Sequence, residues 1–333
     1  MNNNTIEETV IKTLKDFSML RRKDSLILGV SGGPDSICLL RLFHKLKNDY
    51  KLNFVCAHFN HGLRAGESDS ESDFVRALCK ELKVKCLSSK RNVAKLYDGD
   101  SLEQTARRAR YDFFETVSRE TKIKKVALAH HKDDLAETVL MRIIRGSGLR
   151  GVRGFLPNVK IGRINIIRPL INVTKQDILN WLKINDYEYK HDSSNDEDIF
   201  FRNNVRNKLI PSIREFNPNI TDSLCNLAIH AGMDYDFIFQ SAREAFNYTK
   251  ISATKQSITL SLSKLKKMHT SLICNVIRYA VEELKGNVNR LETRHLQEVT
   301  DLINNRPVNS VVNLPFLRVI KEQHSILIQF LIL

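Results

Sequence analysis

Cysteine is scarce in this chain, and its six cysteines stand at positions 38, 56, 79, 86, 225 and 274. No two of them form a Cys-x-x-Cys pair, so the sequence shows neither a zinc knuckle nor the ligand set of an iron–sulfur cluster. Residues 1–24 are polar and lack the apolar core of a secretory signal. No segment approaches the roughly 20 apolar residues that span a bilayer. We therefore expect buried, reduced thiols, no membrane partner and a cytoplasmic location.

Acidic residues are also under-represented. The chain of 333 residues carries 38 Asp and Glu against 52 Lys and Arg, which gives a net charge of +14. This excess makes polyanions, and nucleic acid above all, the first partners to consider. With 42% hydrophobic residues the chain is long enough for two domains, each with its own core.

A glycine loop stands between an apolar strand pattern and a helical pattern near the N-terminus. The run Leu26–Val30 leads directly into Ser31, Gly32, Gly33, Pro34, Asp35 and Ser36. A strand that turns into a helix in this way directs backbone N–H groups and the positive end of the helix dipole at one point, where an anion can bind. The serine hydroxyls add further donors. An ordinary strand-to-helix turn is the alternative, but six consecutive residues fit anion binding.

This loop lacks two familiar phosphate-binding patterns. It contains neither Gly-x-x-x-x-Gly-Lys-Ser/Thr nor Gly-x-Gly-x-x-Gly, which weakens the kinase, GTPase and dinucleotide-binding interpretations.

Strand and helix patterns alternate along the first half of the chain. The expected strands cover 26–30, 53–58, 84–87 and 125–129, and the expected helices cover 36–47, 67–82, 102–120 and 134–145. This alternation predicts an α/β fold with a doubly wound, mostly parallel sheet. Ligands of such sheets bind outside the carboxyl ends of the strands, where the loop at 31–36 and the segments 58–64 and 130–137 should meet.

The second half is predicted to be more helical. We expect a helix at 175–183, a polar loop at 191–198 and a basic helix at 201–213, with a domain boundary near Pro218. These patterns predict a first domain over 1–218, a helical linker over 219–250 and a small α+β domain over 251–333.

Two carboxylates, Asp134 and Glu137, share one face at the start of a predicted helix. Like charges this close repel unless a cation lies between them, so they are candidates to bind an amine or Mg²⁺. The alternative is that they are first-turn acids that interact with the helix dipole. His130 and His131 precede them, but no third ligand at convincing spacing supports a metal site there.

Basic residues gather in the window 141–168, which holds seven of them and no acid. Glycines keep part of this window in loop form, and a basic loop suits a phosphate backbone. A solvated surface is the alternative. The same two interpretations apply to Arg202 and Arg206 on the predicted basic helix and to Arg107 and Arg110 on an earlier one.

Several motifs in one order carry a family resemblance. The loop resembles the pyrophosphate loop (PP-loop) of the ATP pyrophosphatases. The segments 57–64, 106–111, 130–138 with 140–149, 192–195 and 202–206 resemble motifs of the tRNA(Ile)-lysidine synthetases.

This resemblance implies a ligase that uses ATP and Mg²⁺ to join L-lysine to the wobble cytidine of tRNA(Ile) with a CAU anticodon, which changes its decoding from AUG to AUA. The implied catalytic residues are Asp35, Arg110, Asp134, Glu137 and Arg206. ATP is expected at Ser31, Gly32, Gly33, Pro34, Asp35, Ser36 and His58, with Asp35 as the candidate Mg²⁺ ligand. Lysine or tRNA is expected at Arg64, Arg107, Asp134, Glu137, Arg145, Arg150 and Arg202.

Two other functions stay open at this point. A tRNA thiolase of the same superfamily would share the loop and the basic surface, although no paired cysteines are visible near the site. A catalytically inert tRNA-binding module is the third interpretation. The sequence also leaves the oligomeric state open, with a homodimer among the alternatives, and we expect the chain to be too short for a further C-terminal domain found in some relatives.

Overall fold

The computed structural model describes residues 5–62, 67–93, 102–190 and 201–331. These residues form two compact units, Met1–Ile229 and His230–Leu333. The division falls inside the long helix α10 (Ile220–Thr249). The helix expected over 219–250 is therefore present, while the three functional domains stay a prediction. Among the described residues no helix is both long and apolar enough to cross a membrane.

The first unit is built on a six-stranded sheet. Its strands are β1 (Ser25–Gly29), β2 (Asn53–Asn60), β3 (Cys86–Lys90), β4 (Lys125–Ala127), β5 (Asn158–Ile161) and β6 (Ile164–Ile167). They lie in the order β3-β2-β1-β4-β6-β5, and every pair is parallel except β5 with β6. The predicted doubly wound, mostly parallel sheet is confirmed.

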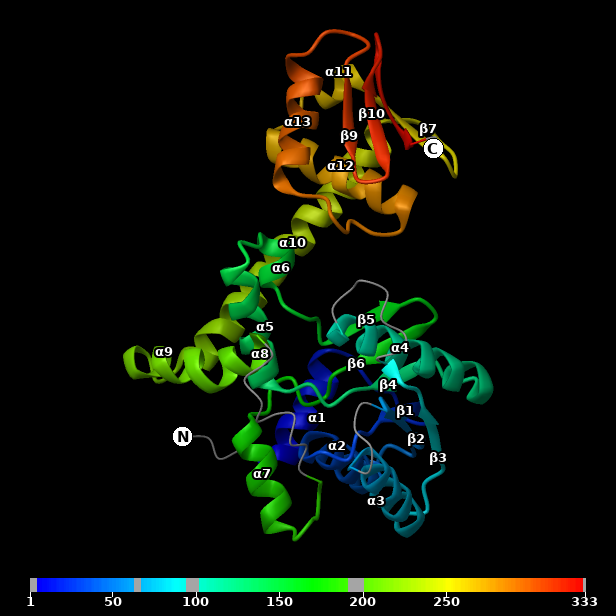
Figure 1. The fold of residues 1–333 in the computed structure, drawn as a ribbon, viewed down its shortest axis with the longest axis vertical. Helices are drawn as coiled ribbons and strands as arrows, with labels where there is room; N and C mark the ends of the chain where they lie inside the picture. The colour runs from blue at the N-terminus through cyan, green and yellow to red at the C-terminus, as the bar shows by residue number, and fades with distance from the viewer. Residues whose placement is uncertain (1–4, 63–66, 94–101, 191–200, 332–333) are drawn as a thin grey trace. The chain divides into compact units, whose positions relative to one another are not determined.

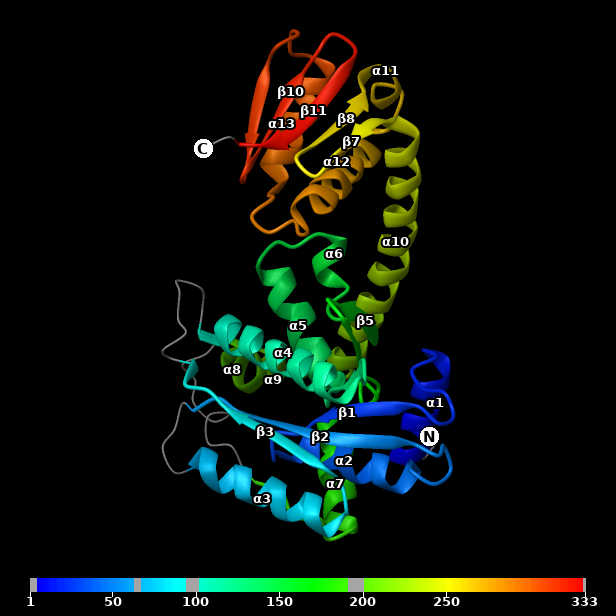
Figure 2. The same ribbon diagram turned by 90° about the vertical axis from the view of Figure 1, so that its right-hand side faces the viewer.

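Helices cover both faces of this sheet (Figure 2). The helical elements of the first unit are α1 (Ile6–Asp16), α2 (Pro34–Leu46), α3 (Glu67–Glu81), α4 (Leu102–Thr121), α5 (Lys132–Ile144), α6 (Leu149–Val152), α7 (Lys175–Ile184), α8 (Phe201–Asn204), a π-helical turn η3 (Val205–Leu209), α9 (Ile210–Phe216) and the start of α10. Figure 2 shows α4 on one side of the sheet and α2, α3 and α7 on the other.

The central strand explains why its sequence is apolar throughout. Leu26 and Leu28 face the core that holds α1, α2, α3 and α7, while Ile27 faces the core that holds α4. Successive side chains of a strand point to opposite faces, so a strand buried on both faces needs an unbroken apolar run. The loop that follows β1 is thereby fixed at the carboxyl edge of the sheet.

Three local features differ from the sequence analysis. The basic window 141–168, expected to be partly loop, contains the antiparallel hairpin β5–β6. The polar N-terminal segment contains α1, which begins with a capping box between Thr5 and Glu8. The basic helix expected over 201–213 is divided by the π-helical turn η3.

The second unit is a small α+β fold (Figure 1). Its strands are β7 (Lys250–Ala253), β8 (Ser257–Ser261), β9 (Val311–Leu314), β10 (Leu317–Lys321) and β11 (Ser325–Phe330), paired antiparallel in the order β7-β8-β11-β10-β9. The helices α11 (Leu262–Leu265), α12 (Thr270–Lys285) and α13 (Thr293–Asn304) share one apolar core with the sheet. The expected mixture of helices and short strands is confirmed.

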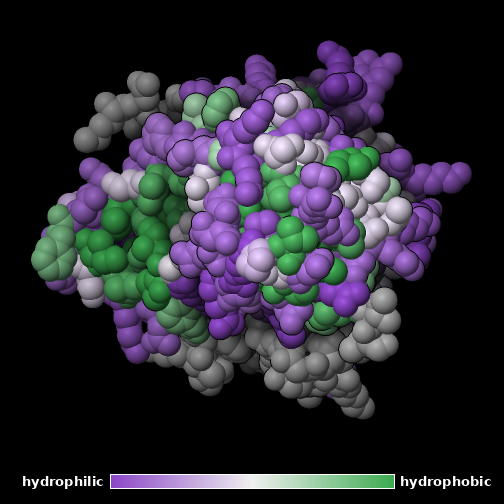
Figure 3. All heavy atoms as spheres, turned by 90° about the horizontal axis from the view of Figure 1, so that it is seen from above, coloured by the Kyte–Doolittle hydropathy of each residue, from purple (hydrophilic) through white to green (hydrophobic). Residues whose placement is uncertain are grey.

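The surface is mostly hydrophilic in the view of Figure 3, with hydrophobic areas between the polar ones. One hydrophobic area lies at the left of that view, the side on which α9 is seen in Figure 1. Phe216, at the end of α9, is 89% exposed. Part of the exposed apolar surface of the first unit therefore lies on α9.

Candidate active site at the carboxyl edge of the sheet

The glycine loop forms the turn between β1 and α2. Gly32 adopts a φ of 104°, in the left-handed region that favours glycine. Gly33 is the N-cap of α2, and Pro34 occupies its first turn, where a missing N–H costs nothing. This local sequence therefore ends the strand and starts the helix within a few residues, and the N-terminus of α2 faces the carboxyl edge of the sheet.

Ser36 holds the loop in shape. Its hydroxyl oxygen accepts hydrogen bonds from the backbone N–H groups of Ser31 and Gly32, both at 3.1 Å, and the hydroxyl donates to the carbonyl of Gly33 at 2.9 Å. The sequence analysis expected Ser36 to donate directly to a bound anion. In this structure its hydrogen is already bonded within the loop, so Ser36 organises the other donors.

His58 connects the loop to its neighbours. Its Nδ1 lies 2.9 Å from the carbonyl oxygen of Val30, and its Nε2 lies 2.9 Å from the hydroxyl of Ser72 on α3. The ring is buried, and desolvation lowers the pKa of His58 below its usual value. The neutral ring thus ties the end of β1 to α3.

A group of acids surrounds His131 at the start of α5. Its ring nitrogens lie 3.8 Å from a carboxylate oxygen of Asp35, 3.6 Å from one of Asp133 and 3.5 Å from one of Asp134. Burial alone would lower the pKa of His131, but these carboxylates raise it above its ordinary value. Lys175 binds the same group, because its ammonium lies 2.6 Å from Asp35 and its backbone N–H donates to Asp133 at 2.7 Å.

The predicted acidic pair faces two arginines. Arg202 Nε donates to Glu137 at 2.9 Å, and Arg206 Nε donates to the other oxygen of Glu137 at 2.5 Å. Arg206 Nη2 also donates to Glu137 at 3.0 Å and to Asp134 at 3.2 Å. Glu137 is 1% exposed, and the two arginines supply the hydrogen bonds that a buried carboxylate needs. We call these four residues the carboxylate–arginine cluster.

The charges of this cluster reinforce one another. Desolvation raises the pKa of Asp134, but the neighbouring His131, His130 and Arg202 outweigh it and lower that pKa to about 2. Desolvation likewise lowers the pKa of Arg206, but the hydrogen bond to Glu137 and the charges of Glu137, Asp134 and Asp35 together outweigh it and raise the pKa. These shifts favour the ionised forms of Asp134 and Arg206.

A second cluster of basic residues, Arg107, Arg110 and Arg168, lies near His130. Burial lowers the pKa of His130 well below its usual value, and the nearby charges of Arg168, Arg110 and Arg107 lower it further. Arg168 is buried at the end of β6, where Nη1 donates to the carbonyl of Leu156 at 2.5 Å. Burial lowers the pKa of Arg168 to about 10. Arg107 and Arg110 thus reach the same edge of the sheet as the acids.

The structure brings together most of the predicted site residues. Asp35, Asp134, Glu137, Arg202 and Arg206 belong to one connected set of contacts through His131.

The other predicted site residues are not part of this set of contacts, and some of them are not among the residues that the structure describes. Arg145 caps the end of α5 and stacks on Phe201 at 5.4 Å, next to Arg202. Arg150 lies in α6. Arg64 and the motif at 192–195 lie outside the described residues.

Sequence reasoning predicted the helix that starts at Lys175 but gave neither Lys175 nor Arg168 a place in the site. The Thr174 cap places Lys175 in the first turn of α7, and that position at the helix start was the available signal. Arg168 directly follows the apolar strand β6, and a charged residue at the carboxyl end of a buried strand is a signal for the ligand-binding edge.

The chain is similar to known proteins in sequence and in fold. A family model described as a PP-loop domain matches residues 3–213. A tRNA(Ile)-lysidine synthase of Caldanaerobacter subterraneus is 34% identical over 312 residues, which cover 93% of this chain and 66% of that protein. One of Clostridioides difficile is 31% identical over 314 residues, which cover 93% and 67%. The chain thus spans about two thirds of the length of these curated relatives.

A solved structure shows the same fold. The U34-tRNA thiolase NcsA from Methanococcus maripaludis, with its [4Fe-4S] cluster, matches with a TM-score of 0.57 and 20% identity, over 68% of this chain and 78% of that one.

Proposed function

The chain belongs to the tRNA(Ile)-lysidine synthase family, and we propose on that premise that it joins L-lysine to the wobble cytidine of tRNA(Ile) with a CAU anticodon at the expense of ATP. The reaction has two steps, adenylation of the base and displacement of AMP by lysine. ATP supplies the leaving group that the cytosine oxygen lacks.

The first step takes place at the glycine loop. The O2 atom of cytosine attacks the α-phosphorus of ATP, an O–P bond forms, and the bond to the β-phosphate oxygen breaks to release pyrophosphate. The loop between β1 and α2 holds the departing pyrophosphate with backbone N–H groups and the N-terminus of α2.

Asp35 is the carboxylate that would bind cations beside these phosphates. Mg²⁺ is often held by a single carboxylate together with substrate phosphates, so Asp35 fits it, and the ion would offset charge on the leaving pyrophosphate. The ammonium of Lys175, 2.6 Å from Asp35, provides a positive charge from the protein at the same carboxylate.

The second step takes place beside the carboxylate–arginine cluster. The ε-amine of lysine attacks C2 of the adenylated base, a C–N bond forms, and the C–O bond to AMP breaks. The amine must lose a proton before it attacks C2, and a carboxylate can hold the ammonium in place. Asp134 is suited to hold it because its pKa is lowered to about 2, which keeps it ionised, and its side chain is 16% exposed, whereas Glu137 is enclosed by the two arginines.

One observation carries this proposal. His131 lies within 3.8 Å of Asp35 and within 3.5 Å of Asp134, so the acid of the phosphate loop and the acid assigned to lysine belong to one site. A ligase of this type needs the activated base and the amine side by side.

The basic residues are assigned to the tRNA. We assign Arg110 and Arg206 to phosphate or to the target base, which must be unstacked into a pocket to react. Arg107, Arg145, Arg150 and Arg202 are assigned to the surrounding RNA or to lysine.

The test is to incubate the protein with ATP, lysine and the minor isoleucine tRNA, and to weigh the nucleosides after digestion. We expect cytidine to gain the mass of one lysine less one water, with AMP and pyrophosphate formed in equal amounts. A gain of sulfur would establish thiolation, and ADP with orthophosphate would reject the assigned role of the loop.

A further inference from the structure

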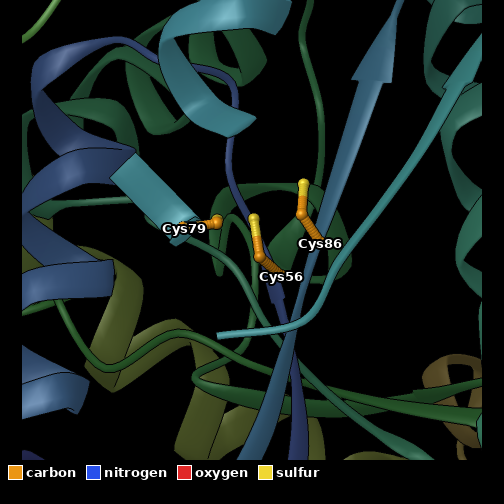
Figure 4. A group of neighbouring side chains, drawn as sticks. All are labelled: Cys56, Cys79 and Cys86. Atoms are coloured by element: carbon orange, nitrogen blue, oxygen red, sulfur yellow. The ribbon is translucent and has the colours of Figure 1, made fainter. Parts of the chain in front are cut away.

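Three cysteines from three elements of the first unit meet in one place. Cys56 lies on β2, Cys79 on α3 and Cys86 on β3, and their sulfur atoms all lie within 4.8 Å of one another. Figure 4 shows the side chains gathered between the strands and the helix. Cys56 and Cys79 are buried and Cys86 is partly exposed. Among the described residues, no other group of three or more His, Cys, Asp and Glu side chains has all its ligand atoms this close together.

The spacing of the sulfurs suits a single metal ion. Metal–sulfur bonds of about 2.3 Å place the sulfurs about 3.8 Å apart in tetrahedral geometry and about 4.0 Å apart in a trigonal plane. Movements of less than about 1 Å would therefore bring all three thiolates onto one ion. An iron–sulfur cluster needs a wider arrangement, because each cysteine binds a different iron atom. We propose that Cys56, Cys79 and Cys86 form a binding site for one thiophilic divalent cation such as Zn²⁺.

The charge of such a site has a partner nearby. Three thiolates and one divalent ion carry a net charge of −1, which is costly to bury without a counter-charge. Arg76 lies one helical turn before Cys79 on α3, and its guanidinium donates to the hydroxyl of Ser88 at 3.2 Å. Ser88 follows Cys86 by two residues on β3, so Arg76 lies on the same side of the sheet as the thiols.

A cavity of about 230 Å³ is lined by residues of the same three elements that carry the thiols. The lining residues are His58 and Asn60 on β2, Ser72, Asp73 and Arg76 on α3, and Ser88 to Lys90 on β3. Cys56 and His58 are two positions apart on β2, and Cys86 and Ser88 are two positions apart on β3. Each pair therefore lies on one face of its strand. Of the three cysteines, Cys86 is the one that is partly exposed.

The test uses Cd²⁺ as a spectroscopic substitute for Zn²⁺. The full chain is reduced, freed of metal with a chelator and titrated with Cd²⁺, while the ultraviolet absorbance of thiolate-to-metal charge transfer is followed. We expect saturation at one equivalent and loss of the band when Zn²⁺ is added. Cys56→Ser and Cys86→Ser should each weaken binding by more than the roughly 10- to 100-fold that loss of an outer-shell partner costs.

Matched controls are available in the same unit. Cys38→Ser and Cys225→Ser change buried cysteines outside the cluster and should leave the titration unchanged. Circular dichroism checks folding, and Cys86→Ser remains informative if Cys56→Ser does not fold, because Cys86 lies nearer the surface.

Four results would overturn the proposal. They are an unchanged cadmium titration in folded Cys86→Ser, no charge-transfer band in the unmodified chain, the visible absorption of an iron–sulfur cluster after anaerobic purification, and a disulfide within the cluster when the chain is weighed without reductant.

Discussion

Glu137→Gln tests whether the carboxylate–arginine cluster carries both stability and lysine recognition. Glutamine keeps the shape of the side chain and removes its charge. Glu137 accepts three hydrogen bonds from Arg202 and Arg206. Bonds to charged groups contribute about 1.5–3 kcal/mol each. The arginine side chains are 29% and 34% exposed, so water and Asp134 compensate part of the loss, and we expect the variant to lose about 2–3 kcal/mol.

This loss predicts a measurable change in melting temperature. In a unit of 229 residues each kcal/mol shifts Tm by about 2–4 °C, so the variant should melt about 4–12 °C lower. The matched control is Glu120→Gln, an exposed residue on α4, which should stay within about 0.5 kcal/mol of the unmodified chain. Differential scanning calorimetry at neutral pH makes the comparison.

The same variant should impair lysine use selectively. The charge of Glu137 holds Arg206 against Asp134. Without that charge, lysine binding should weaken by at least about 1.4 kcal/mol, which corresponds to a roughly tenfold increase in the KM for lysine. The KM for ATP should change less than about twofold. An unchanged Tm would refute the energetic reasoning, and an effect confined to ATP would assign Glu137 to metal binding instead.

The remaining predictions concern the glycine loop, the loss of stability at low pH and the binding of tRNA. Asp35→Ala should abolish ATP-dependent incorporation of labelled lysine while tRNA binding, measured by filter retention, persists; retained incorporation would reject the role assigned to Asp35. Because the pKa of Asp134 falls from 3.8 to about 2, its contribution of about 2 kcal/mol is present above pH 4 and lost as pH falls toward 2. Asp134→Asn should therefore show a smaller fall of Tm between pH 5 and pH 3 than the unmodified chain, and equal falls would contradict the assignment. Arg150→Glu should weaken tRNA binding and reduce its salt dependence by about one unit of slope, whereas an unchanged slope would indicate a solvated surface.

Much of the fold followed from local patterns. Apolar runs at β1 and β2 and helical periodicity in α2, α4 and α5 predicted a parallel sheet, and the carboxyl-edge rule then predicted that Asp35 and Asp134 would meet. The hairpin β5–β6 was missed because glycines and basic residues masked two short strands. Such strands depend on pairing with a neighbour rather than on their own propensity.

The partners of the site residues were harder to predict. Sequence spacing placed Asp134 and Glu137 on one face, but the two arginines come from a segment more than sixty residues later. The three cysteines illustrate the same limit, since spacings of 23 and 7 residues match no metal-binding motif. Contacts between distant segments are set by the packing of the sheet and its helices.

Lys175 gives the phosphate loop and α5 a common anchor with two separable parts. Its side chain is bonded to Asp35, and its main chain is bonded to Asp133. A flexible ammonium can leave a carboxylate when another cation arrives, while an amide at a helix start stays in place. If a cation displaces this ammonium during the proposed reaction, the main-chain bond to Asp133 would still hold the junction of α5 and α7.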